Sequence, residues 1–273
     1  MAPLIRAGNY ADLTHLYQLD RASEPAMALA RRLDDLSIAV ADSEAESVPG
    51  GVFDPMARRF ADMALAARAR LMDQLDRTNL ETLRAVASKA IETGLSAEDT
   101  AASLSLVAGL APRMANAALS YADGLRQPAT PGLAARAYHD RRFNPAPARD
   151  EAAVERMTER YVDRALAGRA AEIANTETVR AASEGQRAAW QQGIDRGDVP
   201  LNSLRSFWLT ARDERVCKIC AGIPPLNRRG VLFSQSFMSP AGPVDAPPAH
   251  PRCRCSLRHR VMLYTEPLPL AAE

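Results

Sequence analysis

The sequence predicts an α+β protein that is mostly α-helical, with long N-terminal helices followed by a small, loop-rich C-terminal module with short strands. Over most of residues 25–197, apolar residues recur at three- and four-residue steps, which is the periodicity of amphipathic helices. Only 5% of the residues are aromatic and alanine is abundant, a composition that favours closely packed helices over a sandwich or barrel. Beyond residue 197, proline, glycine and β-branched residues become more frequent, which is typical of loops and short strands.

The chain has 273 residues, which is enough for one domain or two. We expect an N-terminal extension over 1–24, a helical region over 25–197 with a candidate sub-boundary near 127–150, a C-terminal module over 198–262 and a tail over 263–273. With 34 basic and 33 acidic residues, the global charge indicates no particular partner. Polar residues interrupt the N-terminus early, and no apolar stretch approaches the roughly 18 residues of a membrane span. We therefore expect a soluble protein made in a reducing cytosol, with no membrane partner.

The predicted helices have recognisable ends. The apolar pattern over 55–94 changes phase near Asn79, so that either one bent helix or two helices, the second capped by Asn79, are expected. Gly94 is a typical residue after a helix C-terminus, and Ser96 begins a weak capping box for the next helix. Pro112 suits the first turn of another helix.

Two proline-containing breaks, 127–132 and 144–149, enclose a segment that we expect to be a short basic helix, a solvated face more often than a contact surface. Its polar residues are Arg136, His139, Arg141 and Arg142. A long helix is predicted from about 151 to 194, closed by Gly197. We expect Trp190 and Trp208 to be core anchors that join the helical region to the C-terminal module.

Strict alternation marks the last predicted strand, between residues 252 and 261. One face carries Cys253, Cys255, Leu257, His259 and Val261, and the other carries Arg252, Arg254, Ser256, Arg258 and Arg260. If the segment is a strand, both thiols point the same way and the arginines form a basic row on the other side. A shorter alternation around Phe207 predicts another strand.

All four cysteines lie in the C-terminal module, as Cys217-x-x-Cys220 and, after a long loop, His250-x-x-Cys253-x-Cys255. Two short clusters of soft ligands separated by a loop are what one tetrahedral Zn²⁺ requires. Disulfides are less favoured, because a bridge across Cys253-x-Cys255 would be strained and no feature indicates secretion. The remaining alternative is that reduced thiols pack as small apolar residues.

Five candidate ligands therefore compete for four places. An ideal strand separates residues i and i+2 by nearly 7 Å at Cα, whereas sulfurs bound to one zinc ion lie less than about 4 Å apart. The preferred set is therefore Cys217, Cys220, His250 and Cys253, with Cys255 as the alternative fourth ligand. Four protein ligands leave no open position, so we expect one structural zinc ion without a catalytic water.

Three motifs follow one another in order along residues 138–260. They are AEIANTETVRA at 171–181, followed by Gly185 and Trp190; WLT at 208–210, followed by DERVC at 213–217; and PPAHPRCRC at 247–255. In this order and spacing they resemble the phage Mu F-like minor head proteins, also called phage head morphogenesis proteins. The chain departs from the family pattern at Asn175, where relatives usually have arginine, and some relatives lack the first cysteine pair.

The resemblance implies a minor capsid protein of a tailed bacteriophage, present in few copies. Such a protein is made in the bacterial host cytoplasm, lies in the virion head interior or portal region, associates with the portal protein and acts in head assembly or DNA packaging and delivery. A sequence-independent nucleic-acid-binding zinc module is the alternative, with packaged DNA contacted through Arg252, Arg254, Arg258 and Arg260.

An enzyme with a transferase-like fold is a weaker alternative. The sequence contains no Gly-rich phosphate loop, no His-Glu-x-x-His helix and no nucleophile elbow. Glu177 and Asp213 are the best acidic candidates, and helix-face or turn roles explain both, with Thr176-Glu177 expected to contact the zinc module. We therefore expect no catalytic residues, no cofactor other than zinc and no small-molecule substrate.

Overall fold

The computed structural model describes residues 23–127, 131–142 and 150–262 of the chain. The predicted tail and most of the predicted N-terminal extension lie outside these residues. The described part is mostly helical, at 61%, and its few short antiparallel strands lie in the C-terminal region. The predicted fold class is therefore confirmed.

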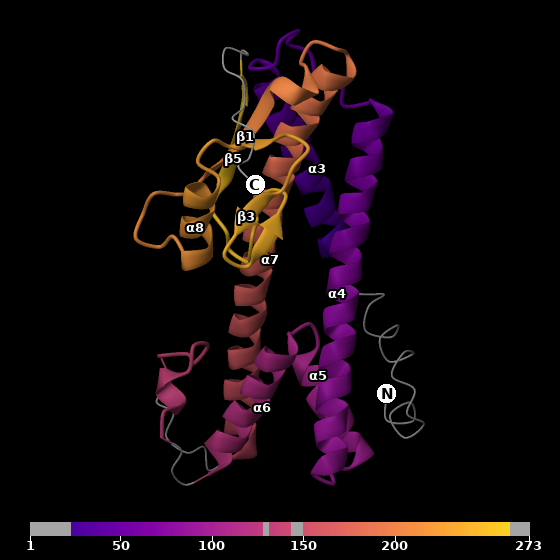
Figure 1. Ribbon diagram of the computed structural model, residues 1–273. Coiled ribbons are helices and arrows are strands. Elements are labelled where there is room, and N and C mark those ends of the chain that lie inside the picture. The colour runs from indigo at the N-terminus through magenta and orange to yellow at the C-terminus, as the bar shows by residue number, and fades with distance from the viewer. Residues whose placement is uncertain (1–22, 128–130, 143–149, 263–273) are drawn as a thin grey trace. The chain divides into compact units, whose positions relative to one another are not determined.

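Six helices and five strands follow one another in the described residues (Figure 1). The helices are α3 (Ser23–Ala45), α4 (Arg58–Glu92), α5 (Ala97–Val107), α6 (Pro112–Arg126), α7 (Glu151–Asp195) and α8 (Lys218–Leu226). The strands are β1 (Leu204–Leu209), β2 (Val231–Leu232), β3 (Phe237–Ser239), β4 (Gly242–Val244) and β5 (Ser256–Val261), and two 3₁₀ turns, η1 and η2, span Leu133–Ala135 and Leu201–Ser203. None of these helices has the length and apolar character needed to cross a membrane.

The chain divides into two compact units, and each is discontinuous in sequence because α4 and α7 contribute to both. One unit comprises the described residues of 1–28 and 66–171, and the other those of 29–65 and 172–273. The boundaries predicted near residue 197 and near 127–150 stay predictions.

The helix ends of the first unit follow the predicted signals. Gly94 has a positive φ of 71°, and the side chain of Ser96 caps α5 by accepting a hydrogen bond from the Asp99 amide. Pro112 opens α6. Helix α4 is continuous across Asn79, so the alternative of two helices is wrong.

The core of the first unit is made of aliphatic residues and two tyrosines. Leu104, Val107, Leu110 and Leu125 are fully buried, and the rings of Tyr121 and Tyr161 stack with centroids 4.5 Å apart. Apart from Leu110, which lies in the turn between α5 and α6, these side chains come from α5, α6 and α7, and Leu83 and Val86 of α4 add to the cluster. The core of the first unit is thus mainly apolar.

The predicted basic helix over 136–142 is wrong. Beyond the η1 turn, the described residues of this segment form turns instead. Asp140 accepts the backbone N–H of Arg142 at 3.2 Å, and His139 is buried with its Nδ1 2.9 Å from the Tyr121 hydroxyl. Such side-chain to backbone bonds compete with helix formation, and the Arg142 guanidinium also lowers the pKa of Asp140.

The second unit contains a three-stranded antiparallel sheet in the order β2-β1-β5 and a separate β3-β4 hairpin. In its larger core, Trp190 of α7 packs with Leu204 of β1, with Phe233 and with Ala41 of α3. Helices α3 and α7 approach closely at Gly185, where a Cβ atom would clash with the Ser37 carbonyl oxygen. Glycine at this position therefore permits the close helix packing.

Candidate metal centre

Two segments far apart in sequence bring the five predicted ligands together. Cys217 is the N-cap of α8, where its sulfur accepts the backbone N–H of Cys220 at 3.4 Å, and Cys220 lies in the first helical turn. His250, Cys253 and Cys255 lie in the segment between β4 and β5. All five side chains form one cluster that could hold a metal ion.

The ligand atoms form two trios that share Cys220. One trio is Cys217, Cys220 and His250, and the other is Cys220, Cys253 and Cys255; within each, the ligand atoms lie within 4.8 Å of one another. The Sγ atoms of Cys220 and Cys253 are 3.8 Å apart, which matches the separation of about 3.8 Å for two sulfurs bound tetrahedrally to zinc. Cys220 is therefore the central member of the cluster.

His250 presents Nε2 to the thiols. This atom lies 3.0 Å from the Cys217 sulfur and 3.1 Å from the Cys220 sulfur. The other ring nitrogen, Nδ1, lies 2.7 Å from the carbonyl oxygen of Pro251, to which it can donate its hydrogen. That bond fixes the tautomer with a free lone pair on Nε2, as in most metal-bound histidines.

Cys255 belongs to the cluster because the chain before β5 is not an ideal strand. Strand β5 begins only at Ser256, and Arg252 has a left-handed φ of 59°. The Cα separation of nearly 7 Å expected for residues i and i+2 of an ideal strand therefore does not apply to Cys253 and Cys255, and it does not exclude Cys255 as a ligand. Which four of the five residues bind the metal stays a prediction.

A tryptophan supports a thiolate at Cys255. The indole N–H of Trp208 is buried and has no hydrogen-bond partner of ordinary geometry among the described residues. The same N–H lies close to the Cys255 sulfur, where it favours the thiolate, but the Cys253 thiol and burial outweigh it, so the pKa of Cys255 is raised without a metal. A thiolate at Cys255 would thus give an otherwise unpaired buried donor its acceptor.

Without a metal, the four thiols have unequal acidities. The neighbouring Cys255 thiol, as a hydrogen-bond donor, lowers the pKa of Cys253 to about 5, and the pKa of Cys255 is raised in return. Burial raises the pKa of Cys220 to about 12. Burial opposes ionisation of Cys217 too, but backbone N–H donors and His250 bring its pKa below the usual value. A divalent cation would favour the thiolate at each position.

The cluster lies in a small apolar core of its own. Ile223 and Phe237 are fully buried beside Cys220, Cys253 and Cys255, and Leu257 is nearly so. The rings of Trp208 and Phe237 meet edge to face with centroids 5.3 Å apart. Trp190 and Trp208 are both buried, as predicted. Trp190 of α7 packs with Leu204 of the C-terminal module and so joins the two predicted regions, whereas the buried cluster that contains Trp208 is made of residues 208–257 of the module itself.

Helix α7 is fastened to the segment that carries His250 and Cys253. The hydroxyl of Thr176 accepts the backbone N–H of Arg252 at 3.0 Å, and the Arg252 side chain pairs with Glu172 at 3.2 Å. The predicted contact of Thr176 with the module is therefore confirmed. Glu177 differs, because its carboxylate pairs with Arg180 one turn later on the same helix.

The other acidic candidate, Asp213, also forms an ion pair. Its two carboxylate oxygens accept bonds of 2.5 and 2.7 Å from the Arg254 guanidinium, which lowers the pKa of Asp213 to about 2. Asp213 also accepts the backbone N–H of Arg215. This ion pair links the segment before α8 to Arg254, which lies between Cys253 and Cys255.

The predicted alternation of the last strand is confirmed. From Cys253 to Arg260, buried and exposed residues alternate without interruption, with the cysteines, Leu257 and His259 buried and the arginines exposed. The four arginines are nevertheless not equivalent. Arg252 and Arg254 form ion pairs, whereas Arg258 and Arg260 form none with the part of the chain that the structure describes.

No protein-family model, curated protein or solved structure matches the chain. The residues and their geometry therefore carry the functional argument.

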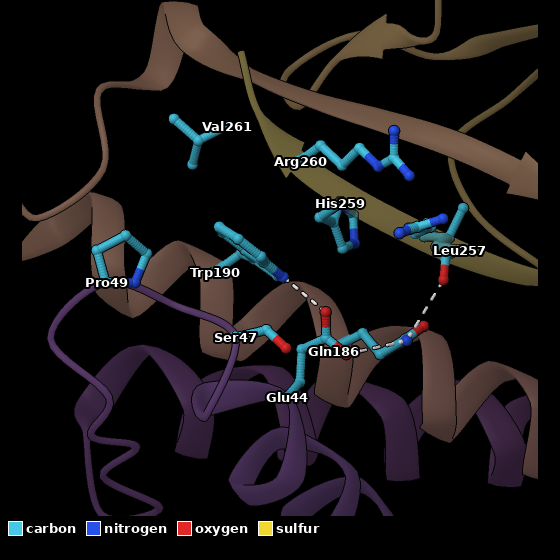
Figure 2. A pocket seen from close by; sticks show the side chains of 10 residues that line it. Glu44, Ser47, Pro49, Gln186, Trp190, Leu257, His259, Arg260 and Val261 are labelled. Carbon is cyan, nitrogen blue, oxygen red and sulfur yellow. Dashed lines mark hydrogen bonds between the residues drawn. The ribbon is translucent and has the colours of Figure 1, made fainter. Parts of the chain in front are cut away.

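Sequence reasoning missed a polar group beside β5. Glu44 of α3 accepts the Trp190 indole N–H at 2.8 Å and the Gln186 amide at 3.3 Å, in a pocket of about 540 Å³ (Figure 2). His259 lines this pocket, with Nδ1 2.9 Å from the Ser206 hydroxyl, and burial followed by the charge of Arg187 lowers its pKa to about 3. No sequence signal connects Glu44 to Trp190, because 146 residues separate them.

Proposed function

We propose that this chain is a minor capsid protein of a tailed bacteriophage that associates with the portal protein and acts in head morphogenesis. In this proposal, one zinc ion holds the C-terminal module together and has no catalytic role. The observation that carries the proposal is that the three motifs of the phage resemblance contact one another around the cysteines. Thr176 of the first motif bonds Arg252 of the third, and Asp213 of the second pairs with Arg254 of the third.

Those contacts give a physical reason for the three motifs to occur together. Each contact lies within a few residues of a candidate ligand, so each motif supplies either a ligand or a support for one. Partners bonded to a ligand itself typically change metal affinity by about 10- to 100-fold, and these contacts, which bond the residues beside the ligands, should have a smaller effect in the same direction. The motifs are therefore interpreted as one structural unit rather than as three separate sites.

Zinc is the metal that best suits this donor set. Thiolates and imidazole are soft or borderline ligands, which favour zinc over magnesium or calcium, and the cluster includes no carboxylate. Cys217, Cys220, His250 and Cys253 would hold the ion, with Cys255 as the alternative to one of them. Four such ligands close the coordination shell, and the zinc would then supply folding energy and no reactive water.

Metal analysis of the purified, reduced protein tests the zinc assignment. We expect about one zinc ion per chain, lost in C220S because Cys220 belongs to both trios. C255S is the matched variant: retention of zinc would leave the preferred four ligands in place, and loss would make Cys255 a ligand. Absence of zinc from freshly purified wild-type protein would overturn the assignment.

The assembly role has a separate test. Terminase and portal genes should flank the gene for this chain, and the purified protein should co-sediment with the portal protein encoded beside it. Deletion of the gene should lower the yield of infectious particles without abolishing portal synthesis. Absence of both neighbouring genes, or no co-sedimentation with the cognate portal, would contradict the proposal.

A further inference from the structure

The side of the β2-β1-β5 sheet that faces away from α7 carries arginines from two adjacent strands. In the antiparallel register, Arg205 of β1 lies opposite Arg260 of β5, and Phe207 lies opposite Arg258. Directly opposed side chains lie on the same face with Cβ atoms about 5 Å apart. Figure 2 shows Arg260 extending from β5 on the side away from Trp190 and His259. We call Arg205, Phe207, Arg258 and Arg260 the arginine face.

This face has a local excess of positive charge. None of the residues of β1, β2 and β5 is acidic. Arg258 and Arg260 are exposed and have no carboxylate partner within the described ranges. Arg205 donates to the backbone carbonyl oxygens of Arg229 and Gly230 at 3.2 Å, which orients its guanidinium without neutralising the charge.

The neighbouring Arg252 and Arg254 differ from the arginine face, because both form ion pairs within the protein. Arg252 pairs with Glu172, and Arg254 makes a bidentate pair with Asp213. Their charges are therefore compensated within the protein, although they belong to the same alternating row as Arg258 and Arg260. Residues 205–260 include ten Lys and Arg residues but only three acidic residues, Asp213, Glu214 and Asp245. Three of the ten, Arg205, Arg258 and Arg260, lie on the strands of this sheet.

We propose that the arginine face binds double-stranded DNA through its backbone phosphates. Guanidinium groups bind phosphate oxygens in bidentate geometry, and a row of phosphates matches several arginines on one flat sheet. The aromatic ring of this face, Phe207, is half-buried with its ring against Gly230, and the exposed large apolar side chains of the described residues include no aromatic ring. The face therefore offers little for the stacking of unpaired bases. A duplex is therefore the better fit, and its binding should be independent of base sequence.

Phe207 lies half-buried on the arginine face. Its ring lies against Gly230, where any added Cβ atom would collide with it. Phe207 is the residue directly opposite Arg258 in the register of β1 and β5. The proposal rests on the charges of the sheet alone, so it is independent of the assignment to head morphogenesis.

Fluorescence anisotropy with the full chain, a duplex of about 20 base pairs and salt from 50 to 200 mM tests this proposal. Three arginines that each neutralise a phosphate predict a slope of log K against log salt of about −3, because each contact contributes about −0.9. R258A/R260A should reduce the magnitude of the slope by about 2 and weaken binding about tenfold or more at 50 mM salt. The matched control R84A/R113A, which removes two exposed arginines of α4 and α6, should keep both the slope and the affinity.

Three results would overturn the inference. These are no binding of wild-type protein at 50 mM salt, an equal loss of affinity in the two double variants, or tighter binding of a single strand of the same length than of the duplex. Thermal unfolding of R258A/R260A checks that the exposed substitutions leave the fold intact, and its zinc content should equal that of the wild type. Failure of DNA binding with normal zinc and normal portal binding would remove this inference alone.

Discussion

The helical unit and the C-terminal module achieve burial by different chemistry. In the helical unit, aliphatic side chains and stacked tyrosines from several long helices form the core. In the core around Trp208, three of the seven buried residues are cysteines. Burial of aliphatic side chains stabilises a fold whether or not a metal is bound. A cluster of cysteines stabilises a fold mainly when it binds a metal ion. The two regions should therefore respond to different perturbations.

Removal of the metal should produce the largest difference between the two regions. Structural zinc sites contribute about 10 kcal/mol or more of binding free energy in small domains, so chelation or C220S should unfold the module. The helical signal in far-ultraviolet circular dichroism should persist, because the first unit contains no ligand. Tryptophan fluorescence should report the loss of packing at Trp208. Unchanged fluorescence after complete zinc removal would contradict this prediction.

A cavity in the first unit should lower the stability of that unit and leave zinc binding by the C-terminal module unchanged. Leu104 is fully buried in the α5 and α6 packing, and Leu104→Ala should lower the free energy of unfolding by about 3 kcal/mol. The zinc content should stay at the wild-type level. Thermal unfolding combined with metal analysis measures both quantities, and loss of zinc in this variant would mean that the two regions are not separable.

Acidification should destabilise the second unit through His259. Its pKa of about 3 in the folded state lies below the ordinary value of 6.5, so the folded protein binds this proton less readily than the unfolded chain. The contribution of neutral His259 to the free energy of unfolding is therefore fully present above about pH 6.5. It decreases as the pH falls toward 3, with about 2 kcal/mol lost by pH 5.

A comparison with His259→Gln isolates this residue from the metal ligands. The variant should be less stable at neutral pH, because its bond to Ser206 is altered, but its stability should fall less steeply between pH 6.5 and 5. Chemical denaturation of the zinc-loaded proteins measures the two slopes. Equal slopes would exclude His259 as the source.

The smallest effect is expected at the link between α7 and the ligand segment. Thr176→Val keeps the shape of the side chain but removes the acceptor of the Arg252 amide, at a cost of about 1 kcal/mol. Thr78→Val is a matched control, since its hydroxyl donates within α4 to the carbonyl of Gln74. Zinc affinity should fall severalfold in the Thr176 variant alone, as measured by competition with a chelator.

Much of the fold could be predicted from local signals. Ser96, Pro112, Gly94 and Gly197 mark helix ends because capping and positive φ depend on the nearest residues. The alternation of β5 follows equally from strand geometry. The helix predicted around Asp140 is wrong because the Asp140 side chain bonds the Arg142 amide locally, and because His139 contacts Tyr121 of α6, a tertiary contact that the local pattern does not contain.

The candidate site was only partly predictable. The five ligands could be named from spacing, but an ideal strand gave a misleading distance between Cys253 and Cys255. The left-handed φ of Arg252 and the late start of β5 decide that point, and a non-glycine residue in this conformation has no reliable sequence signal. The ion pairs of Arg252 and Arg254, which separate them from Arg258 and Arg260, depend on residues distant in sequence.

The alternation from Cys253 to Arg260 also limits how this segment can change in length. Because side chains repeat every two residues in a strand, insertion or deletion of one residue would exchange the two faces. Within β5, Leu257 and His259 would then point to solvent, and Arg258 or Arg260 would enter the buried side of the sheet. Substitutions on the exposed face should be tolerated far better than a single-codon insertion. In this stretch, the count of residues is a stricter constraint than their individual identities.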